Sequence, residues 1–186
     1  LGNREVARIR GLMEAEIRAS GFTGDFAAFQ RFLRTDRQFY AQTPEDFVRY
    51  ASEMAKRADG ELPRLFATLP RLPYGIRVIP ENQAEGSTTA YYSPGSTALG
   101  ISGSYWVNTT RLDQRPLYEL PALTVHEAMP GHHLQIARSQ ELGELPYFRR
   151  NAFETAFVEG WGLYAETLGE EMGMYRTPYE RFGRLS

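Results

Sequence analysis

Two kinds of hydrophobic spacing alternate along this chain, and their order limits the folds that it can adopt. Apolar residues recur every three or four positions up to Leu69, as on one face of a helix, and the same spacing returns after Pro116. Between these parts, residues 74–110 contain short runs rich in β-branched and aromatic residues, which predict strands. This order is typical of an α+β fold that is mainly helical and has one small antiparallel sheet.

Helix boundaries in the first half of the chain are marked by capping and breaking residues. Thr43-Pro44-Glu45 combines a threonine N-cap, a proline at the first helical position and an acid in the first turn, so a helix begins here. Pro70 and Pro73 exclude helix around them, because proline lacks the amide hydrogen and clashes with the preceding turn. We expect helices over residues 4–19, 25–33, 43 to 58 or beyond, and 146–173, the last as one long helix.

Three short strands are expected between the helical parts, at residues 76–79, 88–92 and 104–109. Residues 93–103, which are rich in glycine, serine and proline, would form a mobile connection between the last two strands. We therefore predict a single domain, 1–186, with a helical part (1–73), a small sheet (74–110) and the helices of an active site (116–175).

Composition excludes several classes of protein. Hydrophobic residues make up 42% and charged residues 24% of the 186 residues, as in ordinary globular domains. The net charge is only -2, with both signs mixed along the chain, so no nucleic-acid partner is expected. No apolar run approaches the roughly 20 residues of a transmembrane helix. Because the chain has no cysteine, any metal must be held by histidines and carboxylates.

All three histidines, His126, His132 and His133, lie within eight residues, beside Glu127. Neutral imidazole is the commonest protein ligand of zinc, and metal-activated hydrolases also need an open position for water and a carboxylate that accepts its proton. Adjacent residues of a helix point about 100° apart, so His126 could face a metal while Glu127 flanks the water. The cluster therefore predicts a zinc site with Glu127 as the general base.

Spacing alone leaves the second ligand open between His132 and His133. Pro130 stands where the motif H-E-x-x-H has its second histidine, and in an undistorted helix His132 would lie about 9 Å along the axis from His126. However, Pro130 removes the amide that would bond back to His126, and Gly131 permits unusual backbone angles. We expect the helix to bulge or break here, which would carry His132 back towards the metal.

The last predicted helix should supply a third ligand, and Glu159 and Glu166 are both candidates. They are seven residues apart and lie on nearly one face, together with Leu163, so burial is expected for them. A buried carboxylate must be paired or must bind a cation. Gly160 and Gly162 are costly within a helix, which indicates close packing against another backbone.

A simpler hypothesis makes the histidines a solvated patch on a helical scaffold, with Pro130-Gly131 ending one helix before the next begins. The acids of the last helix would then face water. The glutamate beside His126 and the acids that follow favour the metal site over this alternative.

Two long motifs resemble a known family. Residues 126–135 (HEAMPGHHLQ) and 159–166 (EGWGLYAE) resemble a large bacterial family catalogued as domain of unknown function 885, and the similarity runs from residue 32 to the end of the chain. This family looks like a branch of the zinc metallopeptidases in which a glutamate on a later helix is the third ligand. The resemblance therefore implies a zincin-like core.

In the related peptidases the second ligand follows a glycine, which by similarity favours His132 over His133. Their third ligand lies some two dozen residues later, and Glu159 lies 27 residues after His132. The resemblance thus implies one zinc ion held by His126, His132 and Glu159, with Glu127 as the catalytic base.

The resemblance also implies supporting roles. Glu166 and His133 would hydrogen-bond to the metal ligands and orient them. Tyr105 and Asn108 would bind the substrate, because their strand would be the sheet edge to which an extended peptide adds. The alternative for these two residues is a place in the sheet core.

A zinc-dependent hydrolase, and more narrowly a peptidase acting on peptide or related amide bonds, is the function that the resemblance implies. The alternative is a catalytically silent metal- or peptide-binding protein of the same fold. Family members extend beyond both ends of this chain, so we expect it to be the central, metal-binding part of a larger protein. The family favours an exported location, such as the periplasm, over a cytoplasmic one.

Overall fold

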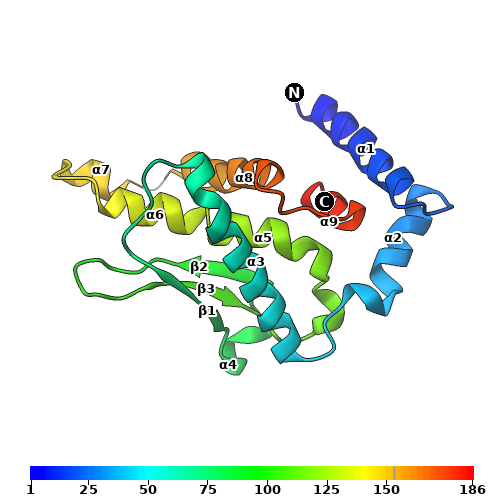
Figure 1. Ribbon diagram of the computed structural model, residues 1–186, viewed down its shortest axis with the longest axis horizontal. Coiled ribbons are helices and arrows are strands. Elements are labelled where there is room, and N and C mark those ends of the chain that lie inside the picture. The colour runs from blue at the N-terminus through cyan, green and yellow to red at the C-terminus, as the bar shows by residue number, and fades with distance from the viewer. Residues whose placement is uncertain (153) are drawn as a thin grey trace.

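The computed structural model describes residues 1–152 and 154–186 and is mainly helical, with one three-stranded sheet (Figure 1). The longer helices are α1 (Gly2–Ala19), α2 (Phe26–Thr35), α3 (Pro44–Leu65), α5 (Leu120–Glu127), α6 (His132–Gln140), α8 (Thr155–Glu171) and α9 (Pro178–Arg184). The shorter ones are α4 (Glu81–Ala84) and α7 (Tyr147–Asn151), and the strands are β1 (Tyr74–Val78), β2 (Ala90–Ser93) and β3 (Gly103–Val107). The predicted α+β class is confirmed.

The first helices begin at the capping residues that the sequence indicates. Asp25 accepts a hydrogen bond from the backbone of Ala28 at 2.7 Å and so caps α2. Thr43 accepts one from the backbone of Asp46 at 3.1 Å and caps α3. In each case a side-chain oxygen pairs an amide that has no partner within the helix.

The sheet is mixed, so the prediction of an antiparallel sheet is wrong. Its order is β1-β3-β2, with β3 parallel to β1 and antiparallel to β2. The chain reverses direction twice between β1 and β3, first through the segment that contains α4 and then through residues 94–102, so these two strands run the same way. Spacing within a strand does not reveal which neighbour it pairs with.

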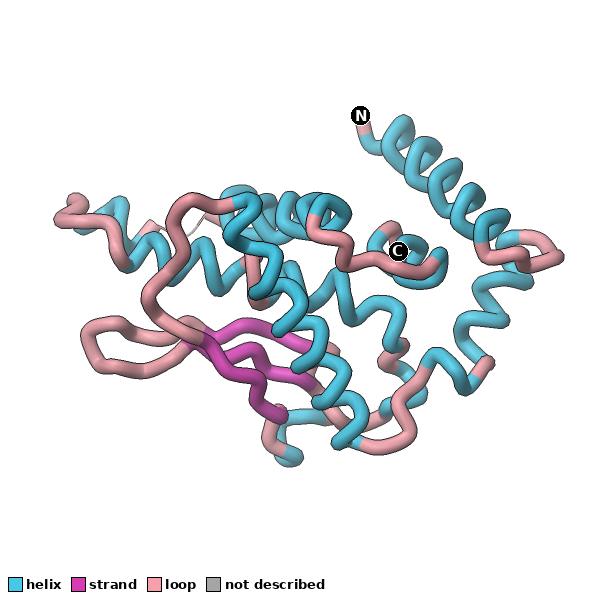
Figure 2. The backbone as a smooth tube through the Cα atoms, in the orientation of Figure 1, coloured by secondary structure: helices cyan, strands magenta, loops and turns pink. Residues whose placement is uncertain are grey.

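The connection between β2 and β3 extends from the sheet as a long loop (Figure 2). Within it Ser96 and Ile101 form a two-way backbone pair, with N···O distances of 2.8 and 3.0 Å. The base of the loop is tied to α6, because the side chain of Gln140 donates to the carbonyl of Gly95 at 2.9 Å.

Helices α5 and α6 lie end to end between the sheet and α8 (Figure 1). On the sheet side, Tyr105 and Val107 of β3 share a buried cluster with Phe47 of α3 and Leu120 of α5. On the other side α5 packs against α8. Residues 120–140 therefore run through the middle of the molecule, where side chains can reach both neighbouring layers.

A separate aromatic cluster joins the two ends of the chain. Phe29 of α2 packs edge-to-face on Phe182 of α9 with a centroid distance of 5.0 Å, and Phe39 packs in the same way on Tyr179 at 4.8 Å. Among residues 1–152 and 154–186, no helix is long and apolar enough to cross a membrane.

The single long helix predicted over residues 146–173 is wrong. The structure has two helices there, α7 and α8, and Ala152 and Glu154 both have extended backbone, with ψ angles of 127° and 109°. Helical spacing continues across this point in the sequence, but it is α8 that packs closely against α5 and α6. Tyr147 and Phe148 of α7 are largely exposed.

Candidate metal centre

The link between α5 and α6 brings two histidines together. The first helix ends at Glu127 and the second begins at His132, so the expected break at Pro130-Gly131 is present. A Cβ on Gly131 would lie 1.8 Å from the carbonyl oxygen of His126, which leaves room for glycine alone. Because of this tight turn the rings of His126 and His132 lie only 4.8 Å apart, centroid to centroid.

Helix α8 packs on this turn through Trp161 and Gly162. The indole Nε1 of Trp161 donates to the carbonyl of Pro130 at 2.8 Å. A Cβ on Gly162 would lie 2.5 Å from two atoms of the His126 ring, so the expected close approach exists here, against a side chain. At Gly160 the expectation is wrong, because a Cβ there would meet nothing within 4 Å.

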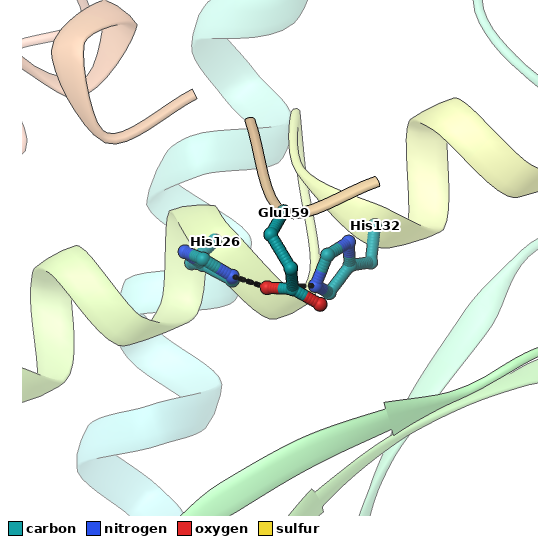
Figure 3. A group of neighbouring side chains, drawn as sticks. All are labelled: His126, His132 and Glu159. Atoms are coloured by element: carbon teal, nitrogen blue, oxygen red, sulfur yellow. Dashed lines mark ion pairs between the residues drawn. The ribbon is translucent and has the colours of Figure 1, made fainter. Parts of the chain in front are cut away.

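One nitrogen of each of these histidines faces Glu159, which α8 supplies (Figure 3). A Glu159 carboxylate oxygen lies 3.4 Å from His126 Nε2 and 3.7 Å from His132 Nε2. The three potential ligand atoms all lie within 4.8 Å of one another. The structure thus brings together the three residues implied as metal ligands.

His126 is oriented from its other side by Glu166. Its Nδ1 lies 2.7 Å from a Glu166 carboxylate oxygen, the arrangement expected of a residue that positions a metal ligand. Since a carboxylate accepts, Nδ1 carries a proton, and Nε2, which faces Glu159, is the nitrogen that could bind a metal. This hydrogen bond is the main cause that raises the pKa of His126, and burial opposes it.

Glu127 lies at the end of α5, between this cluster and the sheet. Burial, as the main cause, raises the pKa of its carboxyl to about 7, while His126 and a hydrogen bond from the backbone N–H of Tyr92 act in the opposite direction. The negative charges of Glu159 and Glu166 raise it further. A carboxylate of this kind can exchange a proton near neutral pH.

His133 is turned away from the cluster, so its predicted contact with a metal ligand is wrong. It is fully buried, its Nε2 lies 2.9 Å from the carbonyl oxygen of Leu72, and its Nδ1 lies 2.8 Å from the hydroxyl of Tyr92. A carbonyl can only accept, so Nε2 carries the proton and Nδ1 accepts from Tyr92. Burial is the main cause that lowers the pKa of His133 to about 4, which keeps this ring neutral. Its effect on the site runs through Tyr92, whose N–H binds Glu127.

Tyr105 and Asn108 do not lie at a sheet edge, so the basis of their predicted substrate-binding role is wrong. Both are fully buried, because β3 is the central strand and not an edge. The Tyr105 hydroxyl lies 3.2 Å from the Thr124 hydroxyl. The Asn108 amide donates to the carbonyl of Ala84 at 2.7 Å and holds the turn before β2. Edge strand β2 is the one beside Glu127.

The two acids of α8 are less buried than the sequence predicts, because one side of this helix faces solvent. Leu163 is 61% exposed, and the side chains of Glu159 and Glu166 are 49% and 20% exposed. Helix α8 is an outer layer (Figure 1), so only one of its sides is covered by α5 and α6, and both acids lie at the boundary of that side.

Comparison with known proteins identifies the family. All 186 residues match the model of a family described as bacterial protein of unknown function (DUF885). The chain belongs to this family. No curated protein matches the sequence.

A solved structure shares the fold of this DUF885 chain. It is described as the "putative lipoprotein" from Colwellia psychrerythraea, is 31% identical and superimposes with a TM-score of 0.90. The match covers 100% of this chain and 33% of the other. This DUF885 chain therefore spans about a third of the length of that relative.

Two contacts of the DUF885 site were not anticipated from the sequence. The backbone of Tyr92 binds Glu127, and Trp161 holds the carbonyls of the turn before His132. Trp161 lies within the EGWG segment, so its position between two glycines and beside Glu159 was a usable signal. Nothing in the sequence marks the amide of Tyr92, because any residue in that strand offers one.

Proposed function

We propose that this chain is the metal-binding part of a zinc-dependent hydrolase that cleaves peptide or related amide bonds. The observation that carries the proposal is the convergence of ligand atoms from His126, His132 and Glu159 within 4.8 Å of one another. These residues come from three helices that are held together by the turn at Gly131 and by the packing of α8. Glu127, beside the first of them, supplies a carboxylate with a raised pKa.

The donor set suits zinc better than magnesium or calcium. Two imidazole nitrogens and one carboxylate oxygen form a ligand set found in catalytic zinc sites, which keep a fourth position open. Magnesium and calcium prefer oxygen ligands throughout. The Glu159 side chain is 49% exposed, so the cluster is accessible to water and to a substrate.

The residues around the cluster have complementary parts in hydrolysis. Bound zinc would supply Lewis acidity, which lowers the pKa of a coordinated water to about 7 and polarises a carbonyl. Glu127 accepts the proton of the attacking water, and its pKa near 7 lets it release that proton later to the leaving amine. Tyr92 orients the Glu127 carboxylate, and Glu166 keeps the lone pair of His126 Nε2 directed at the ion.

The sheet favours an extended peptide as the substrate. In the described part of the chain β2 pairs only with β3, so its second edge has no partner strand. The backbone N–H of Tyr92 on that edge already points at Glu127. A peptide that adds to this edge would bring its carbonyl groups next to the proposed base.

The relative supports two further parts of the proposal. Its description as a lipoprotein supports an exported location for this chain. Its greater length means that other parts of a longer polypeptide could complete the substrate cleft. We therefore propose that this chain holds the metal and the base, and that the whole protein selects the substrate.

Two measurements on the purified chain test this proposal. Elemental analysis after exposure to zinc should find about one zinc per chain, and His126→Ala and Glu159→Ala should lose it. Glu171→Ala is the matched control, because Glu171 lies on the same helix but faces water at its end, and this variant should keep the zinc. The loaded chain is then incubated with a mixture of peptides, and new termini are detected by mass spectrometry.

Glu127→Gln distinguishes the enzyme from its alternative. This variant should bind zinc as the parent does but should produce no new termini, because an amide cannot accept the proton. Zinc binding by the parent without any cleavage would instead support a catalytically silent metal- or peptide-binding protein. Absence of zinc from the parent would refute the metal centre itself.

A further inference from the structure

Two buried polar atoms without a hydrogen-bond partner lie in the first turn of α6, next to the proposed metal centre. His132 Nδ1 and Gln135 Oε1 are both buried, and neither has a hydrogen-bond partner among the described residues. They are three residues apart on one helix, a spacing at which side chains meet. Buried polar atoms are nearly always paired, so two unpaired atoms at one place require an explanation.

The orientation of the Gln135 amide is set by its other end. Its Nε2 donates to the backbone carbonyl of Phe157 at 3.0 Å, and a carbonyl can only accept. The amide nitrogen therefore faces α8, and Oε1, which can only accept, is left on the opposite side. Phe157 is two residues before Glu159, so Gln135 also ties α6 to the segment that carries the third ligand.

A bound metal would make one of the two unpaired atoms a hydrogen-bond donor, and the other is an acceptor. His132 Nε2 is the nitrogen that faces Glu159, at 3.7 Å, so a bound ion would take the lone pair of Nε2. The neutral ring must then carry its proton on Nδ1, which becomes a donor in need of an acceptor. Gln135 Oε1 is an acceptor for which the described part of the chain offers no other donor.

We propose that Gln135 is the positioning residue of the second ligand, accepting a hydrogen bond from His132 Nδ1 when metal is bound. This inference rests on the proposed metal centre and extends it. Each of the two proposed histidine ligands would then donate from Nδ1 to a side-chain acceptor, because Glu166 already accepts from His126 Nδ1. Gln135 would take the orienting role expected of His133, whose two ring nitrogens are hydrogen-bonded to Tyr92 and Leu72.

The chemistry of this pair fits its surroundings. His132 is only 8% exposed, so a proton on its Nδ1 needs an acceptor within the protein. An amide supplies this acceptor without adding a fourth carboxylate to Glu127, Glu159 and Glu166.

Zinc affinity of the whole chain, measured by competition with a chelator, tests the inference. Gln135→Met keeps the length of the side chain but removes its acceptor, and we expect zinc to bind about 10-fold more weakly. Gln140→Met is the matched control. It makes the same change on the same helix, at a side chain that binds Gly95 and not a metal ligand, and it should leave the affinity unchanged.

A second measurement needs no variant. In the zinc-loaded parent, NMR of labelled imidazole should show a protected proton on His132 Nδ1 with a coupling to the side-chain carbonyl of Gln135. Unchanged zinc affinity in Gln135→Met, or a His132 proton that exchanges freely, would overturn the inference while leaving the metal centre intact. Zinc binding without peptide cleavage would overturn the hydrolase and not this role of Gln135. Failure of the parent to bind zinc would overturn both.

Discussion

The two sides of α6 differ in how completely their polar atoms are paired. On the side facing α8, His132 Nδ1 has no hydrogen-bonded partner within residues 1–152 and 154–186, and Nε2 faces Glu159 at 3.7 Å. On the side facing the sheet, both nitrogens of His133 are hydrogen-bonded, to Leu72 and Tyr92. The two histidines are adjacent in sequence, and the roughly 100° between neighbouring residues of a helix places them in different layers.

This difference fits a structural role for His133 and the proposed metal-binding role for His132. His133 joins α6 to the sheet, and its ring also packs on Tyr74 with a centroid distance of 4.8 Å. His132 shares a cluster with His126 and Glu159 in which potential ligand atoms lie within 4.8 Å of one another. The variants below separate the two sides, because one set should change zinc binding and the other set stability.

The largest effect is expected for His132→Ala. Structural zinc sites bind with about 10–16 kcal/mol from four ligands, so the loss of one ligand should cost about 4 kcal/mol, or roughly 1000-fold in affinity. Chelator competition measures this change, and thermal unfolding of the metal-free form should stay close to that of the parent. Retention of one tightly bound zinc would show that His132 is not a ligand.

His133→Ala should act on the other side of the helix. It leaves the Leu72 carbonyl and the Tyr92 hydroxyl without partners and opens a cavity, so we expect the metal-free chain to lose about 3 kcal/mol of unfolding free energy. Urea denaturation measures the loss. The folded fraction should still bind one zinc per chain, and a folded variant that binds none would contradict the division between the two sides.

Two glycines of α8 provide a matched pair. In Gly162→Ala the new Cβ would lie 2.5 Å from the ring of His126, so the ring must shift, and zinc affinity should fall about 10-fold. In Gly160→Ala the Cβ meets nothing within 4 Å, so the helix should gain about 0.5–1 kcal/mol of stability with no change in zinc affinity. Equal changes in zinc affinity in the two variants would contradict the packing of His126 against α8.

The smallest effect is expected for Asp59→Asn, on the sheet side. Asp59 accepts from the Tyr74 hydroxyl at 3.0 Å, and burial, as the main cause, raises the pKa of its carboxyl. A carboxyl with a raised pKa in the folded state destabilises the fold when it is ionised, so stability should increase as pH falls through that pKa. Asp59→Asn should therefore be slightly more stable than the parent at pH 7 and equal to it in acid.

Urea denaturation at several pH values checks this prediction. A difference between Asp59→Asn and the parent that grows in acid would give the opposite sign and refute it. Zinc affinity at pH 7 should be the same in both proteins, because Asp59 is linked through Tyr74 to His133 and not to the cluster around His132.

Features that depend on neighbouring residues in the sequence were predictable. The caps at Asp25 and Thr43 form local hydrogen bonds, and the break at Pro130-Gly131 follows from the chemistry of those two residues. The candidate ligand His126 and the base Glu127 were identified from their residue types and spacing alone. The choice of His132 and Glu159 came from the family resemblance, and the structure places both beside His126.

Tertiary structure decided the features that depend on distant partners. Strand spacing is the same for a central and an edge strand, so only the pairing with β1 and β2 shows that Tyr105 is buried in the middle of the sheet. Helical spacing likewise continues through Ala152, although the backbone is extended there and α7 and α8 are separate helices. The sequence by itself determined which groups could bind a metal. The packing of α8 and the sheet on opposite sides of α6 decided which of them face one another, because the direction of a side chain is set by the layers on either side.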